Sequence, residues 1–538
     1  MGLFARLWLS CSLLVAGTSG LVADEFRTPV VFTARADWHA ALDQMRSEIG
    51  TRASVLPAFT FVNRRRLSGF DPRSMPALVQ LNAVTSRIFT GIRRSAVPVL
   101  LPFDTAGYLE AQWGGESANL PLSHFQADFR PIDIFDAGPA GYDAVFSLDP
   151  GAGEGLPQRI FAKPVEVQIT GSNLIYDIND PLGGKGEPVK SLTSQFPDLR
   201  RFIREGYVRY AFTRFGIAYV VSIQCLDSVP RQRRLACREA YPIAERFLRA
   251  LRVAGGLPSR PSVVITPETI ARPLIQSPDF TYRPPGDIMA RSGSHRQAIG
   301  RTDYTAYSQI RFPLEKAPAF AHSQSRGTRR AAERIDELAG GPTHYPWQDN
   351  FCEARSFGVG QCPSGFGHQG QDMRAPCPAH EAGPEHCDPR HQAVVAVRDA
   401  ILIRSPQQQA ATLQVNTRTE HIRFRYMHMN PNAMDADGVL NGRHVAEGER
   451  IGVVSNYLDH PNGTTRHLHF DVQVFTRDGW LWVNPYTTLI ASYERLIHGR
   501  GREIGPHVIS SSDVAHALPD DGMRRNIESR NIDEGGEN

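Results

Sequence analysis

Six short segments near the C-terminal end of this 538-residue chain constrain its fold most, because each has the pattern of a β-strand. Apolar residues alternate with polar ones in them, and turn residues such as Asn441-Gly442 and Asp478-Gly479 separate them. The segments cover residues 394–403, 412–417, 422–427, 450–455, 467–475 and 480–483. Strands joined by such short connections favour a mainly antiparallel β-sheet assembly.

Three motifs place four histidines and one aspartate in or just before this region. They are Gly-Phe-Gly-His-Gln-Gly-Gln-Asp ending at Asp372, Tyr-Met-His ending at His428, and His-Leu-His ending at His469. A catalytic zinc ion needs three protein ligands of the His or Asp type and keeps one position open for water. The set His368, Asp372, His428, His467 and His469 can supply these ligands, with two histidines left for proton transfer. The motifs therefore fit a zinc hydrolase site.

Each motif alone is weak evidence. On a strand, His467 and His469 point to the same face, but His-x-His is common by chance. His368 and Asp372 are spaced for one helical face, yet the glycines around them favour an extended or looped segment. Alternation places His428 on the same side as the apolar residues of 422–426, where a packed strand-end histidine is the ordinary interpretation. The joint occurrence of the motifs carries the interpretation.

Taken together and in this order, the motifs resemble the lysostaphin/LytM-type family of zinc endopeptidases, over about residues 344–489. The resemblance implies a duplicated hybrid motif fold of antiparallel β-sheets and hydrolysis of peptide bonds in bacterial peptidoglycan. It implies one zinc ion per chain with His368, Asp372 and His469 as ligands. His428 and His467 would then assist, by orienting or deprotonating the zinc-activated water and stabilising the oxyanion. Which of the two is the general base stays open.

Other functions stay open beside this one. Some members of the family are non-catalytic wall-binding or regulatory scaffolds that activate other wall hydrolases, but these usually lose ligands. A second alternative makes the N-terminal domain the functional centre and the zinc domain its support. The bond that is cut also stays open, whether D-Ala–diaminopimelate, a glycine bridge or a peptide outside the wall.

The rest of the chain predicts a multidomain protein. Residues 24–256 read as an α+β domain of unknown role, with strands expected at 165–178 and 207–225 and a helix at 236–253. This domain is a candidate binding surface for an envelope protein. Proline-rich residues 257–343 indicate a linker or extended segment. The zinc peptidase domain is expected at 344–499 and a polar tail at 500–538.

The first 23 residues have the pattern of a secretory signal peptide, with a basic start, a short apolar run and small residues at its end. We therefore expect an exported protein, periplasmic or extracellular, without a transmembrane segment. The net charge of +3 gives no indication of a nucleic-acid partner.

The chain has seven cysteines, and removal of the signal would take Cys11 away. The remaining even number predicts disulfides in an oxidising compartment. Chain order suggests the neighbouring pairs 225–237, 352–362 and 377–387, although about fifteen pairings are open. The last pair lies in an insertion at 374–391 that also carries His380 and His386, so a second, structural zinc is the alternative to a disulfide there.

Overall fold

A computed structural model describes most of the chain between Val30 and Leu496. The described ranges are 30–50, 75–112, 120–148, 164–225, 235–258, 310–321, 350–374, 392–456 and 466–496, apart from a few positions inside them, together with Asp459. The expected signal peptide, the C-terminal tail and the pair Cys377 and Cys387 lie outside the described residues. None of the described helices has the length and apolar character that a membrane crossing requires.

A seven-stranded antiparallel sheet forms the centre of the N-terminal half, defined here as residues 30–258. Its strand order is β3-β4-β5-β10-β9-β8-β7. The strands are β3 (Phe129–Gly138), β4 (Gly141–Leu148), β5 (Glu166–Ser172), β7 (Glu187–Pro188), β8 (Arg200–Arg204), β9 (Tyr207–Arg214) and β10 (Ile217–Gln224). The hairpin β9–β10 confirms the prediction for residues 207–225, and it turns through Phe215 and Gly216, both at positive φ.

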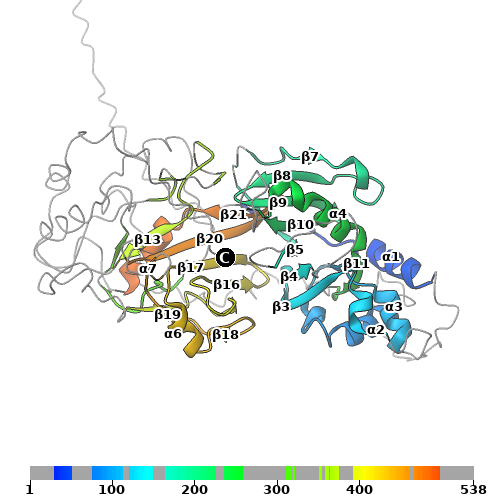
Figure 1. Ribbon diagram of the computed structural model, residues 1–538, viewed down its shortest axis with the longest axis horizontal. Helices are drawn as coiled ribbons and strands as arrows, with labels where there is room; N and C mark the ends of the chain where they lie inside the picture. The colour runs from blue at the N-terminus through cyan, green and yellow to red at the C-terminus, as the bar shows by residue number, and fades with distance from the viewer. Residues whose placement is uncertain are drawn as a thin grey trace, which may run out of the picture.

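Helices and two small sheets surround this sheet. The helices are α1 (Trp38–Gly50), α2 (Met75–Thr85), α3 (Thr105–Gln112) and α4 (Ala240–Ala250), with 3-10 turns η1 (Ile92–Arg94), η2 (Leu122–Phe125), η3 (Lys190–Leu192) and η4 (Cys237–Glu239). The small sheets pair β1 (Val30–Thr33) with β6 (Leu174–Asp177) and β2 (Val99–Leu101) with β11 (Arg252–Gly255). α4 lies over the seven-stranded sheet, whereas α1 to α3 lie at the end farther from the C-terminal half (Figure 1).

The helix expected at 236–253 is shorter than predicted. Its regular part ends at Ala250, and Leu251 is already extended. Val253 then pairs with Leu100 in the β2–β11 sheet. The apolar residues of this stretch therefore belong to two elements, α4 and β11. The helix ends early because β2 supplies hydrogen-bond partners for the backbone of β11.

An eight-stranded sheet forms the C-terminal half, defined here as residues 310–496. Its order is β12-β13-β20-β17-β16-β15-β18, and β21 pairs with β20. The strands are β12 (Phe320–Ala321), β13 (Gln371–Arg374), β15 (Ala400–Ile403), β16 (Ala411–Asn416), β17 (His421–Met427), β18 (His444–Val445), β20 (Leu468–Thr476) and β21 (Gly479–Val483). All its pairs are antiparallel, which confirms the predicted mainly antiparallel β-sheet.

Two details differ from the expected strands. Residues 394–403 form two strands, because β14 (Ala393–Val395) pairs with β19 (Arg450–Val453) outside the large sheet while β15 stays in it. Residues 310–314 lie within the expected linker or extended segment, yet Ile310, Phe312 and Leu314 are buried in the core of the C-terminal half. Helices α6 (Pro431–Ala436) and α7 (Tyr486–Leu496) complete this half.

The eight-stranded sheet has one apolar and one polar face. Phe424, Tyr426, Phe470 and Val472 belong to the core on the apolar face. Because side chains alternate along a strand, His469, Asp471 and Arg425 occupy the opposite face. This polar face runs from the histidine motifs at one end of β17 and β20 to His421 and Phe475 at the other.

The N-terminal half packs on the end of that polar face that contains His421 (Figure 1). This end is called the far end below, and the end with the histidine motifs is called the near end. At the far end, Asp143 contacts His421 and Arg423, Thr170 accepts a hydrogen bond from the Trp480 indole at 3.0 Å, and Gly184 N donates to Asp478. A small apolar cluster, including Val220 and Phe475, adds to the contact. Buried contacts therefore join the two halves. The predicted domain boundaries, at 256 and 343 above all, stay predictions.

Candidate metal centre

Three buried donor atoms converge at the near end of the polar face. His469 Nδ1 lies 2.9 Å from His368 Nε2 and 3.1 Å from Asp372 Oδ1. The third side of this triangle, from His368 Nε2 to Asp372 Oδ1, measures 3.3 Å. Among the described residues, this is the group of His, Cys, Asp and Glu side chains that can converge on one metal ion.

The sheet itself brings two of these residues together. β13 and β20 are antiparallel neighbours, and Asp372 stands directly opposite His469 in their register. Side chains of directly opposed residues lie on the same face a few ångströms apart. His368 precedes β13 in a loop, so the motif is extended, as the glycines predicted, and the chain bends to return the imidazole to Asp372.

The triangle has the dimensions that zinc requires. Zinc binds His nitrogen and carboxylate oxygen at about 2.0–2.1 Å, which separates neighbouring tetrahedral ligands by about 3.3 Å. Two imidazole nitrogens and a carboxylate oxygen are also the donor types of hydrolytic zinc sites. The residues present therefore fit the ion.

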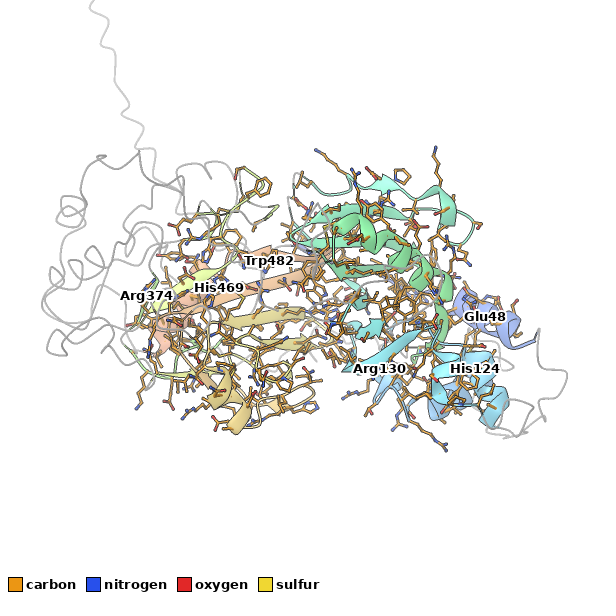
Figure 2. The ribbon with its side chains drawn as sticks, viewed as in Figure 1. Glu48, His124, Arg130, Arg374, His469 and Trp482 are labelled. Carbon is orange, nitrogen blue, oxygen red and sulfur yellow. A yellow bond between two sulfur atoms is a disulfide. The ribbon has the colours of Figure 1, made fainter. Side chains whose placement is uncertain are left out.

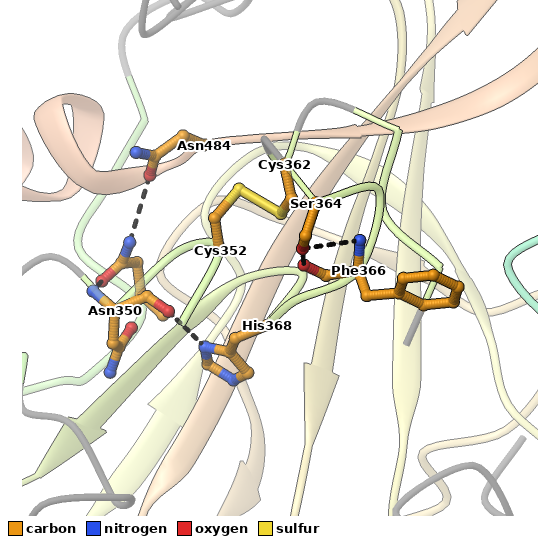
Figure 3. The surroundings of a disulfide bond; sticks show 8 residues. Asn350, Cys352, Cys362, Ser364, Phe366, His368 and Asn484 are labelled. Carbon is orange, nitrogen blue, oxygen red and sulfur yellow. Dashed lines mark hydrogen bonds between the residues drawn. A yellow bond between two sulfur atoms is a disulfide. The ribbon is translucent and has the colours of Figure 1, made fainter. Parts of the chain in front are cut away.

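Asn350 holds two members of the triangle from outside. Its carbonyl oxygen lies 3.0 Å from His368 Nδ1 (Figure 3). Its side-chain oxygen accepts a hydrogen bond from Asp372 N at 3.2 Å. A proton on His368 Nδ1 leaves the lone pair on Nε2, the nitrogen that faces the triangle. Sequence reasoning missed Asn350, because a backbone carbonyl leaves no signal in side-chain patterns.

A disulfide supports the loop that carries His368. Cys352 and Cys362 are bonded, and Figure 3 shows this bond beside His368. Cys352 N donates to the His368 carbonyl, and His368 N donates to the Glu353 carbonyl. The bonds Cys225–Cys237 and Cys352–Cys362 confirm the first two predicted pairs. Two disulfides fit an oxidising compartment.

A glycine allows β20 to pass close to the loop. A Cβ at Gly370 would lie 2.4 Å from the Phe470 carbonyl oxygen and 2.8 Å from His469 Nε2. These distances are below van der Waals contact with groups held by the sheet, so a larger residue would separate β13 from β20. Gly370 thus has a steric role that the sequence analysis used only as evidence against a helix.

His428 and His467 lie beside the triangle. Their ring centroids are 4.6 Å apart, and His428 is 6.1 Å from the His469 ring. His467 Nε2 lies 3.5 Å from Asp372 Oδ1. All five predicted residues are therefore gathered in one place, and each is at most 4% exposed.

The prediction that His428 lies on the same side of its strand as the apolar residues of 422–426 was wrong. Strict alternation would place it with Tyr426 on the apolar face, away from the triangle. Its backbone instead has φ of 64°, a left-handed conformation uncommon outside glycine. β17 ends at Met427, and this backbone change brings the imidazole to the polar face beside His467. His467 likewise precedes the first residue of β20, Leu468.

The surroundings of Asp372 and His428 determine the protonation state of each side chain. Burial alone raises the pKa of Asp372, but His368 and His467 bring it well below its ordinary value, so the group is a carboxylate. Burial, together with His467 and His469, holds the pKa of His428 well below its ordinary value. His428 is therefore neutral near pH 7 and able to accept a proton.

Comparison with known proteins gives limited likeness. No family model and no curated protein matches the chain. A solved structure described as a candidate glycyl-glycine endopeptidase LytM from Ruminococcus gnavus is 17% identical, over 37% of this chain and 70% of that chain, with a TM-score of 0.21. Helicobacter pylori Csd3 is 17% identical, over 36% of this chain and 39% of that chain, with a TM-score of 0.18. Neither likeness is close enough to assign the chain to a family.

Proposed function

We propose that the protein is an exported zinc-dependent endopeptidase that hydrolyses peptide bonds in bacterial peptidoglycan. One observation carries this proposal. His368, Asp372 and His469 present three buried donor atoms within 2.9–3.3 Å of one another, and two further histidines lie beside them. The resemblance of the motifs to LytM-type endopeptidases supplies the substrate class.

His368, Asp372 and His469 would hold the zinc, one ion per chain. Bound there, zinc would polarise the scissile carbonyl and lower the pKa of its water. His428 and His467 lie on one side of the three ligands, where a neutral imidazole can accept a proton and a protonated one can stabilise the developing oxyanion. These two histidines would carry the proton transfer.

The proposed location and partners follow from the same interpretation. A signal peptide at 1–23 would export the protein, and its substrate would be peptide stems or cross-links of peptidoglycan. The N-terminal half is the proposed surface for an envelope protein partner. It covers the far end of the polar face and leaves the histidine end to the loop of residues 350–370.

Five alanine variants test the proposal. His368→Ala, Asp372→Ala and His469→Ala should each lose zinc. His428→Ala and His467→Ala should keep about one zinc per chain while hydrolysis of purified peptidoglycan falls on the order of a hundredfold or more. His444→Ala, at the exposed position of β18, is the histidine control and should keep both properties.

The two measurements separate the alternatives. Metal content by elemental analysis and peptidoglycan hydrolysis are made on the same preparations. An unmodified protein that holds zinc, hydrolyses no peptidoglycan and accelerates another wall hydrolase would be a regulatory scaffold. Full activity of His428→Ala, or loss of zinc from His467→Ala, would overturn the assigned roles.

A further inference from the structure

Asp471 contacts the outer side of a proposed zinc ligand. It lies two residues after His469 on β20, so both side chains are on the polar face. Asp471 Oδ2 is 3.3 Å from His469 Nε2, an ion-pair distance rather than a well-aligned hydrogen bond, and Asp471 is fully buried. The motif assignments give this carboxylate no role.

Two other side chains fix Asp471 in place. Arg425 Nε donates to Oδ2 at 2.7 Å, and the Trp482 indole donates to Oδ1 at 3.1 Å. Arg425 comes from β17 and Trp482 from β21, the two strands on either side of β20. The carboxylate is therefore held by three neighbouring strands.

The two nitrogens of His469 face different partners. Nδ1 points to His368 and Asp372, and Nε2 points to Asp471. A neutral imidazole carries its proton on one nitrogen and its lone pair on the other. A metal ligand needs the lone pair inward, and an acceptor on the outer nitrogen selects that tautomer and raises the basicity of the ring.

We propose that Asp471, braced by Arg425 and Trp482, is a positioning residue that holds the Nε2 proton of His469 and so presents Nδ1 to the zinc ion. This inference rests on the proposed zinc site. It adds one carboxylate to the site without adding a ligand. His469 and Trp482 both lie on the eight-stranded sheet in Figure 2.

The N-terminal half offers a matched control at the far end of the polar face. Asp143 is also a buried carboxylate that contacts an arginine and a histidine of β17, namely Arg423 and His421. It contacts none of the proposed ligands among the described residues. Asp143→Asn therefore removes a comparable buried charge with no route to the zinc.

The experiment measures zinc affinity by competition with a chelator, on full-length Asp471→Asn, Asp143→Asn and unmodified protein. Asp471→Asn should bind zinc about 10–100-fold more weakly. Asp143→Asn should bind it as the unmodified protein does, even with lower stability. The visible spectrum of the cobalt(II)-loaded protein, which reports ligand geometry, should shift in Asp471→Asn and not in Asp143→Asn.

A second variant covers failure of Asp471→Asn to fold. Trp482→Phe keeps an aromatic ring but removes the N–H that holds Oδ1, and it should lower zinc affinity severalfold. Unchanged affinity in folded Asp471→Asn, or in Trp482→Phe when that variant alone folds, would overturn the inference. So would an unmodified protein without zinc. Weakened zinc binding in a protein that hydrolyses no peptidoglycan would support the inference while refuting the proposed peptidase activity.

Discussion

The two ends of the polar face carry nearly the same set of residues for different purposes. At the near end, Asp471 contacts Arg425 and His469, beside Trp482. At the far end, the members are Asp143, Arg423, His421 and Trp480. Each set has a buried carboxylate between an arginine and a histidine, with a tryptophan of β21 alongside. Composition alone does not tell them apart.

The histidines show what differs. His421 has both ring nitrogens against protein groups, with Nε2 at 2.8 Å from Asp143 and Nδ1 at 2.9 Å from Ser172 Oγ. His469 has Asp471 on one nitrogen only, and its other nitrogen faces the donor triangle. Both partners of His421 come from the N-terminal half, so this histidine fastens the halves together. The inner nitrogen of His469 instead faces two other candidate metal ligands, with which it could share an ion. The second partner of the ring decides the role.

The largest expected effect is on the far end. Asp143→Asn leaves Arg423 without its buried countercharge, and removal of one partner from such a pair costs about 3–5 kcal/mol. Denaturant unfolding of the full chain should show this loss in the transition that includes the N-terminal half. A change in zinc affinity of tenfold or more in this variant would show that the two ends are not independent.

Gly370→Ala should disturb the near end alone. Its methyl group would overlap the Phe470 carbonyl and His469 Nε2, and overpacking of this kind costs about 1–3 kcal/mol. Zinc affinity should fall, because β13 and β20 carry two of the three ligands. Zinc titration is the measurement. Unchanged zinc affinity in Gly370→Ala would contradict the proposed dependence of the site on the close approach of β13 and β20.

Acid should weaken the far end through Asp143. Burial raises the pKa of this group, but Arg423 and His421 outweigh it and bring the pKa below the ordinary 3.8. Its contribution to stability is therefore complete above pH 3.8 and is lost below it, by at most about 1.4 kcal/mol per pH unit. Burial raises the pKa of the neighbouring Asp136, so the contribution of that group to stability changes with pH in the opposite sense. Asp136 is present in both the unmodified protein and Asp143→Asn, so its contribution is common to the two.

Unfolding of the unmodified protein and of Asp143→Asn at several pH values checks this expectation. The difference between them should be constant above about pH 4 and should narrow below it. A difference that instead grows as the pH falls would contradict the assigned sign.

The smallest expected effects are those of replacing Trp480 or Trp482 by phenylalanine. Trp480→Phe removes the hydrogen bond to Thr170 and should cost about 1 kcal/mol of unfolding free energy with no change in zinc affinity. Trp482→Phe should lower zinc affinity instead. Equal effects of both variants on zinc affinity would remove the distinction between the two ends.

Local patterns predicted much of the fold. The alternation in residues 207–225 and 467–475 predicted strands, because successive residues of a strand point alternately to a more apolar and a more polar face. The five candidate site residues, which the structure gathers in one place, were predicted from short motifs that follow one another in a fixed order along the chain. The end of α4 and the division of 394–403 were missed, since both depend on distant strands that supply backbone partners.

The remaining parts of the site lie beyond such patterns. Nothing in the sequence marks the left-handed backbone of His428 or the carbonyl of Asn350. Asp471 did have a signal, a carboxylate two residues after His469 on the same strand face, although its bracing by Trp482 did not. The contact of Asp143 with β17 joins residues about 280 positions apart, which no local period records.

The disulfide beside His368 has a consequence for how tightly the proposed site binds metal. The bond Cys352–Cys362 closes a ring with a sequence separation of 10, and that ring is hydrogen-bonded to the His368 backbone. Closing a ring of this size removes up to about 3 kcal/mol of conformational entropy from the open chain. At the proposed zinc site, a reduced chain would have to supply this ordering on metal binding, which corresponds to about a hundredfold weaker binding. The proposed site would therefore bind metal most tightly once these thiols are oxidised.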